Sequence, residues 1–115
     1  MVDGAWRLLA PPLLWSEVRS SLHEGLRRRD ISTADAAAIR LAFGSLGIVR
    51  DDPPELDEVA WQIADELGLA KTYDAEFLAL ARIRGCLFVT ADARLRRGAD
   101  RLGFVVNPVE LQQRS

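Results

Sequence analysis

The segment from Asp74 to Asp92 constrains the fold of this 115-residue chain more than any other. A mostly apolar helical stretch begins at Asp74 and stops at Gly85, a residue suited to a left-handed helix cap. The apolar run at residues 86–90 is typical of a buried strand. About eleven helical residues rise about 16 Å, and about five extended residues return about the same distance. We therefore predict that the two aspartates meet at one edge of a sheet.

Glu17 is predicted to lie at the same edge. Residues 8–10 indicate a short strand that Pro11 and Pro12 end, and Glu17 then falls in the first turn of an amphipathic helix. In open α/β sheets, ligands bind outside the carboxyl ends of the parallel strands. The chain has one histidine and one cysteine, so three carboxylates at this edge favour a hard cation bound by oxygen over zinc.

Three segments in a fixed order carry a family resemblance. They are residues 11–18, 73–81 and 87–95. The Tyr-Asp-Ala block at 73–75 and the Thr-Ala-Asp block at 90–92 are specific in combination, although either block alone would be weak. Together these segments resemble the PIN-domain family, especially the VapC-type toxins of bacterial toxin–antitoxin pairs, over nearly the whole chain.

The resemblance implies an endoribonuclease that depends on magnesium or manganese and acts as the toxin of a VapBC-type pair. The acidic metal ligands of the family correspond to Glu17, Asp74 and Asp92, with the hydroxyl of Thr90 alongside to orient water or a ligand. Family members are commonly dimers held inactive by a small antitoxin, so a homo-oligomer and an antitoxin partner are expected. The residues alone would indicate only a phosphate ester as the substrate.

The expected fold is a single PIN-like α/β domain over residues 1–115, with three layers, α/β/α, around a central parallel sheet. Residues 48–49 could form a strand or a turn, and the chain from Leu111 onward is predicted to be a polar tail. Strands are predicted at residues 8–10, 86–90 and 104–106.

The start of the chain departs from the family pattern. PIN domains open with a strand that ends in an aspartate, followed by a helix, before the strand that corresponds to residues 8–10. Val2 and Asp3 could suggest that first strand, but a parallel connection needs about a dozen residues or more, and Asp3 lies too close to Leu8. The expectation is therefore a PIN-like domain truncated at its N-terminus, without the first strand, helix and acid of the family.

Composition indicates an ordinary soluble protein. A hydrophobic content of 49% with 28% charged residues excludes wholesale disorder. No apolar run approaches the ~20 residues of a membrane helix, and the N-terminus lacks the features of a secretory signal, so a cytoplasmic protein is predicted. The single cysteine, Cys86, is expected in the core rather than as a nucleophile.

Arginine supplies nearly all of the positive charge, although the net charge of −2 argues mildly against indiscriminate nucleic-acid binding. Guanidinium groups are suited to clamping phosphate. One cluster is Arg27–Arg29, and a second follows Asp92 and could hold an RNA backbone beside the metal. A solvated helix face is the alternative for each cluster. The second cluster consists of Arg94, Arg96, Arg97 and Arg101.

Each predicted acid also has a structural interpretation. Asp74 and Asp92 begin predicted helices, where aspartate is a favoured cap. Capping alone does not explain why both acids and Glu17 are predicted at one edge. Two other functions stay open: a weak or inactive PIN relative that binds an antitoxin or another partner, and an unrelated phosphatase-like or nucleotide-binding α/β domain.

Overall fold

The computed structural model describes residues 6–114, so Val2 and Asp3 lie outside the described residues. The chain divides into two compact units, Met1–Asp52 and Pro53–Ser115, which are considered separately below. That residues 1–115 form a single domain remains a prediction. Within the described residues, no helix is both long enough and apolar enough to cross a membrane.

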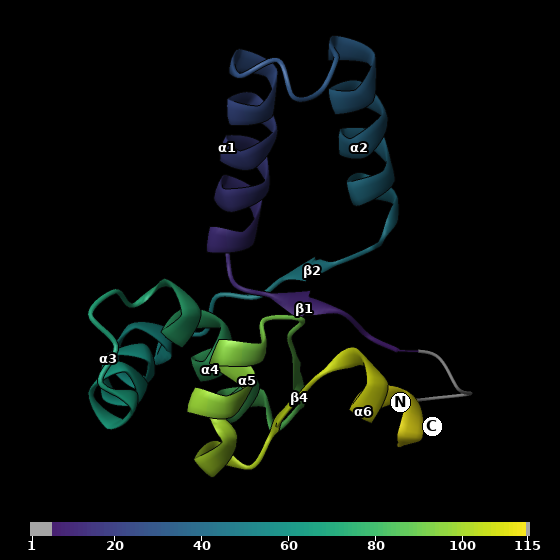
Figure 1. Cartoon of the computed structure of the whole chain (residues 1–115). Helices are drawn as coiled ribbons and strands as arrows, with labels where there is room; N and C mark the ends of the chain where they lie inside the picture. Colours follow the sequence, from purple (N-terminus) through teal and green to yellow (C-terminus); the bar gives the residue numbers. More distant parts are fainter. Residues whose placement is uncertain (1–5, 115) are drawn as a thin grey trace. The chain divides into compact units, whose positions relative to one another are not determined.

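The first unit is a pair of short parallel strands connected by a helical hairpin (Figure 1). Pro11 and Pro12 separate the first strand from the first helix, because proline cannot donate to a ladder but fits a helix start. The second helix opens with a capping box between Ser32 and Asp35, as its sequence indicates. The elements are β1 (Leu9–Ala10), α1 (Leu13–Arg27), α2 (Thr33–Ser45) and β2 (Val49–Arg50).

Aromatic contacts hold the elements of the first unit together. The rings of Trp15 in α1 and Phe43 in α2 meet edge to face, with centroids 6.1 Å apart. The guanidinium of Arg50 in β2 lies 4.7 Å from the centroid of Trp15. Trp15 therefore connects both helices to the second strand.

The second unit contains two long helices followed by a βαβ arrangement. Here β3 pairs with β4 in parallel, with Phe88 opposite Val105 and Val89 opposite Val106. The elements are α3 (Leu56–Leu67), α4 (Tyr73–Arg84), β3 (Phe88–Val89), α5 (Ala93–Gly98), the 3₁₀ helix η1 (Asp100–Leu102), β4 (Val105–Val106) and α6 (Pro108–Gln113).

Helices α3 and α4 form most of the core of this unit. Ile63 of α3 and Leu78 of α4 are fully buried. Gly85 ends α4 with φ of 65°, a left-handed conformation that favours glycine, which confirms the predicted helix stop. On the surface, Arg82 of α4 donates two hydrogen bonds of 3.2 Å to the carboxylate of Glu66 of α3.

The predicted α/β class and the parallel direction of the strands are confirmed. The described strands form two separate ladders, one in each unit, instead of one continuous central sheet. The strands predicted at residues 8–10, 86–90 and 104–106 have only two residues each and are shorter than predicted, and a two-residue strand, β2, forms beside the position where a strand or a turn was expected.

Two other predictions were wrong. The polar tail predicted from Leu111 onward is part of helix α6, Pro108–Gln113. Cys86 was expected in the core but is exposed, because it lies in the turn between Gly85 and β3 and not within the strand.

Candidate functional site

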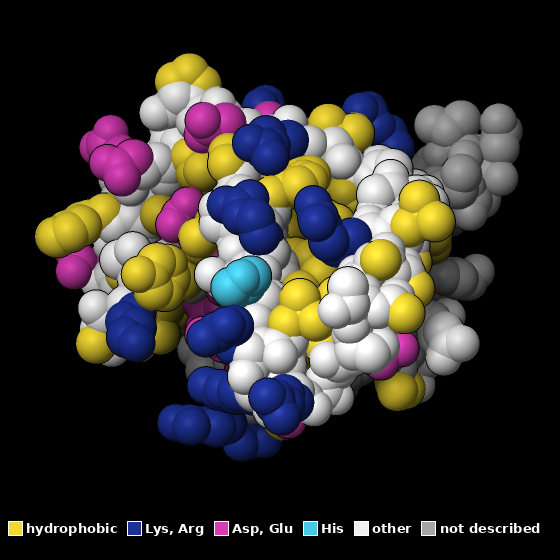
Figure 2. Space-filling view, turned by 90° about the horizontal axis from the view of Figure 1, so that it is seen from above, with side chains coloured by type: hydrophobic (Ala, Val, Ile, Leu, Met, Phe, Trp, Pro, Cys, Tyr) yellow, Lys and Arg dark blue, Asp and Glu magenta, His cyan; other side chains and the backbone are white. Residues whose placement is uncertain are grey.

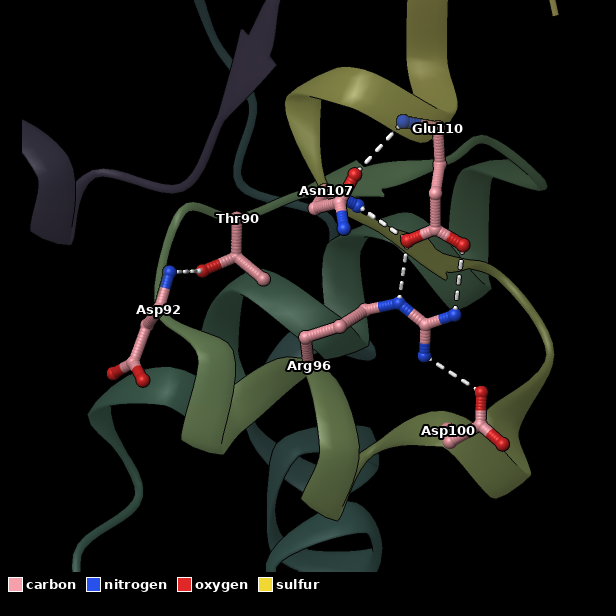
Figure 3. A network of polar contacts seen from close by, with 6 residues as sticks. All are labelled: Thr90, Asp92, Arg96, Asp100, Asn107 and Glu110. Carbon is pink, nitrogen blue, oxygen red and sulfur yellow. Dashed lines mark hydrogen bonds and ion pairs between the residues drawn. The ribbon is translucent and has the colours of Figure 1, made fainter. Parts of the chain in front are cut away.

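Thr90 and Asp92 lie directly after the carboxyl end of β3 (Figure 3). Asp92 is the N-cap of α5, and its Oδ1 accepts hydrogen bonds from the backbone N–H groups of Arg94 at 2.9 Å and Leu95 at 3.2 Å. The backbone N–H of Asp92 donates to Oγ1 of Thr90 at 3.1 Å. The capping role predicted for Asp92 is therefore confirmed.

Capping does not use the whole carboxylate of Asp92. Both capping bonds fall on Oδ1, and within residues 6–114 no hydrogen bond is formed to Oδ2. The side chain of Asp92 is exposed. The hydroxyl of Thr90 acts as an acceptor toward Asp92, which leaves its own proton available for donation. The turn thus presents one carboxylate oxygen and one hydroxyl donor to solvent.

Asp74 is the second residue of α4, and its side chain is exposed. The N-cap of α4 is Thr72, which makes no capping bond through its side chain, so the capping alternative for Asp74 was wrong. The helix dipole stabilises a carboxylate in the first turn, and this stabilisation does not require a hydrogen bond. Asp74 makes no side-chain hydrogen bond or ion pair within the described residues and is available to bind a ligand.

A ring contact connects the first turns of α4 to β3. Phe77 lies three residues after Asp74, on the same side of the helix. Its ring centroid is 6.2 Å from that of Phe88 in β3, two residues before Thr90. The contact packs α4 against β3, and the place of Asp74 beside Asp92 stays a prediction.

Glu17 is an exposed residue of α1 and belongs to the first unit. Its predicted place in the first turn was wrong, because the helix already begins at Leu13 and Glu17 is its fifth residue. Since Glu17 belongs to the first unit, its predicted place beside Asp74 and Asp92 stays a prediction. Among residues 6–114, no group of three histidine, cysteine or acidic side chains is close enough to hold a metal ion. The structure brings Thr90 and Asp92 together, and it does not assemble a three-carboxylate site.

The predicted RNA-binding arginines of α5 differ in their surroundings. Arg94 and Arg97 are exposed and have no carboxylate partner among the described residues. The guanidinium of Arg96 instead donates to Glu110 from Nε at 2.8 Å and from Nη2 at 3.0 Å, and to Asp100 from Nη1 at 2.6 Å. Arg96 could contact RNA only at the expense of these bonds.

The other arginine cluster lies in the first unit. Arg27–Arg29 are all exposed, in agreement with a solvated helix end. Figure 2 shows basic side chains gathered on the face seen from above, with hydrophobic side chains between them.

Sequence reasoning missed Asn107 and Glu110. They form a capping box at the start of α6: Oδ1 of Asn107 accepts from the N–H of Glu110 at 2.8 Å, and the N–H of Asn107 donates to Oε1 of Glu110 at 2.9 Å. The signal was present, because Asn107, Pro108 and Glu110 occupy the N-cap, N1 and N3 positions that these residue types favour.

The network around Glu110 is electrostatically strong. The hydrogen bonds from Arg96 and from the backbone of Asn107 lower the pKa of Glu110 to about 2. The same carboxylates, first Glu110 and then Asp100, raise the pKa of Arg96. An open hollow of about 420 Å³ is lined by these four residues and Arg97. The network thus lies beside Arg97, which has no carboxylate partner among residues 6–114.

The chain has an α/β fold with parallel strands and an acidic turn directly after β3. Comparison with known proteins identifies the family to which a chain with these features belongs. The chain belongs to the PIN domain family, whose family model matches residues 3–101. It is similar to VapC ribonuclease Mb0985 of Mycobacterium bovis and to Ribonuclease VapC9 of Mycobacterium tuberculosis. Each is 35% identical over 92 residues, which cover 80% of this chain and 70% of the relative. No solved structure matches the chain.

Proposed function

We propose that the chain is a VapC-type toxin ribonuclease that hydrolyses phosphodiester bonds in RNA with bound magnesium or manganese. Membership of the PIN domain family and the names of its relatives support this function. The structural observation that carries it is the turn after β3, where Asp92 keeps one carboxylate oxygen free while Thr90 fixes its backbone.

The donor set of the second unit fits a hard divalent cation. Asp74 and Asp92 provide exposed carboxylate oxygens, whereas zinc would favour nitrogen and sulfur ligands. Magnesium usually keeps several waters and takes one or two carboxylates together with substrate phosphates, so two acids are sufficient. Glu17 is proposed as a third ligand, direct or through water. A cation held by these residues would lower the pKa of an attacking water and neutralise charge on the phosphoryl oxygens.

Residues around the site would orient the reactants. The three hydrogen bonds of the turn hold Asp92 in one conformation, so that little rearrangement is needed when Oδ2 binds a ligand. The hydroxyl proton of Thr90 can orient the attacking water or a phosphate oxygen. Arg94 and Arg97 are available to bind the phosphates of the RNA backbone.

The remaining expectations complete this proposal. A single cytoplasmic domain that forms a homo-oligomer and is inhibited by a small antitoxin would suit a VapC-type toxin. Within residues 6–114, each two-stranded ladder has unpaired edges, and such edges favour association with a further strand. We expect light scattering of the purified chain to give a mass above that of one copy, and a monomer would contradict this expectation.

A second candidate is a PIN relative that binds RNA or an antitoxin without cleaving RNA. The observation that favours it is that residues 6–114 contain no group of three metal-binding side chains. Such a protein would keep the fold and the arginines of α5 but would lack a complete site.

The deciding experiment measures RNA cleavage and thermal unfolding of the whole chain with and without magnesium or manganese. If the chain is a nuclease, RNA cleavage should require the cation. A cation concentration of about a hundred times the Kd should also stabilise the fold against unfolding by ~2.7 kcal/mol. Asp92→Asn should remove both effects. RNA binding without cleavage, and unfolding that ignores the cation, would instead support the second candidate.

A further inference from the structure

Helix α5 carries the candidate site but has little to hold it in place. It has six residues and none of them is fully buried. A helix this short is not stable in isolation. Apart from the half-buried Leu95 and the buried Ala99 that follows the helix, its orientation depends on its cap at Asp92 and on the polar contacts of its side chains.

Arg96 makes the strongest of these contacts. Two parallel hydrogen bonds join its guanidinium to the carboxylate of Glu110, a geometry that fixes direction as well as distance. The side chain of Glu110 is 35% exposed and that of Asp100 is 71% exposed. Glu110 is thus the better shielded of the two partners and should dominate the position of Arg96.

Glu110 is itself held against the sheet. Its Oε1 also accepts the backbone N–H of Asn107, which follows β4 directly. The N–H of Thr90 donates to the carbonyl oxygen of Val106 at 3.0 Å, which joins the ends of β3 and β4. The contacts therefore form a closed path that runs from β4 through Glu110 and Arg96 to α5, and back through Asp92 and Thr90 to the sheet (Figure 3).

We propose that Glu110 is a positioning residue of the nuclease site, which orients α5 through Arg96 and so sets the direction of the Asp92 carboxylate. This inference rests on the proposed function, because it assigns Glu110 a role in cation binding and not only in stability. Glu110 would not touch the substrate or the cation. It corresponds to the residues behind a metal ligand whose loss weakens metal binding without removing a ligand.

The test compares two matched variants of the whole chain, Glu110→Gln and Glu66→Gln. Each replaces the carboxylate of a two-bond arginine–carboxylate pair, since Glu66 makes the same kind of contact with Arg82 between α3 and α4. Glutamine is accepted at the third position of a capping box, so the start of α6 is preserved in Glu110→Gln. A purely structural role predicts the same behaviour for both variants.

Manganese affinity by titration calorimetry and the kcat of RNA cleavage are measured for both variants and the wild type. We expect Glu110→Gln to weaken manganese binding about tenfold, with a lower kcat, and Glu66→Gln to leave the affinity unchanged. Both should lower the thermal midpoint to a similar extent.

Equal manganese affinity in Glu110→Gln and the wild type would overturn the inference alone. A wild-type chain that neither binds manganese nor cleaves RNA would overturn the proposed function and the inference together. If Glu110→Gln does not fold, Arg96→Lys provides the same test, because lysine keeps the charge but cannot form the two parallel bonds.

Discussion

The backbone N–H of Asp92 donates to the hydroxyl oxygen of Thr90, two residues earlier, at 3.1 Å. This bond ties the N-cap of α5 to the end of β3, so the direction of the Asp92 side chain depends on its neighbour. Thr90 thus has two separable roles, as an acceptor for Asp92 and as a hydroxyl donor to water or ligand.

Thr90→Val should remove both roles of the hydroxyl while it keeps the shape of the side chain. We expect a loss of about 1 kcal/mol of unfolding free energy, because the N–H of Asp92 loses its acceptor, and a lower kcat of RNA cleavage. Thr90→Ser keeps the hydroxyl and should retain most of the stability and most of the kcat of the wild type. The measurements are chemical denaturation and cleavage kinetics, and full activity in Thr90→Val would argue against any role for the hydroxyl.

Substitutions of Asp92 should distinguish capping from cation binding. Asparagine is as good a cap as aspartate, so Asp92→Asn should change stability little while it abolishes cation-dependent cleavage. Asp92→Ala should lose cleavage and also about 1 kcal/mol of stability. Asp74→Asn, at a residue that does not cap, should lose cleavage alone. Retained cleavage in both asparagine variants would show that the two acids are structural.

Glu110 should make part of the stability depend on acid pH. Its pKa falls from an ordinary value of 4.5 to about 2 in the folded chain. The unfolded chain therefore takes up a proton first as the pH falls, so this contribution is complete above pH 4.5 and is lost toward pH 2. The stability difference between wild type and Glu110→Gln should shrink across that window. A difference that stays constant in urea unfolding from pH 6 to about 2 would contradict the assignment.

Arg94 and Arg97 should contribute to RNA affinity more than Arg96, whose guanidinium is already paired. We expect Arg97→Ala to weaken binding of a catalytically inactive Asp92→Asn chain to single-stranded RNA and to reduce its salt slope by about 0.7. Arg28→Ala, in the exposed cluster at the end of α1, is the matched control. Equal effects at both positions would indicate general electrostatic attraction instead of a contact beside the site.

Local signals in the sequence were sufficient for the turn after β3. Gly85 marks the end of α4, and the apolar residues that follow it lead to a cap at Asp92, all within one continuous segment. The same reasoning overextended the strands, because hydrophobicity does not show how many partner strands are present. It also missed α6, since the polarity of the C-terminal residues was given more weight than the capping pattern at Asn107.

The contacts of Arg96 could not be predicted in the same way. Its partner Glu110 is 14 residues away, and the two meet only because β4 pairs with β3 and brings α6 beside α5. A run of arginines after an aspartate suggests phosphate binding equally for every member. Only the structure distinguishes the paired arginine from its two exposed neighbours. The place of Glu17 depends similarly on long-range packing and stays a prediction.

The two ladders differ in the length of chain that each one closes. Leu9 pairs with Val49 across 40 positions, whereas Phe88 pairs with Val105 across 17. The entropic cost of closing a loop rises with the logarithm of the number of residues in the loop. The β3–β4 ladder therefore costs about 0.7 kcal/mol less to close than the β1–β2 ladder. The strand that precedes Thr90 and Asp92 therefore forms the more local contact, and of the two ladders this one depends less on distant segments to find its register.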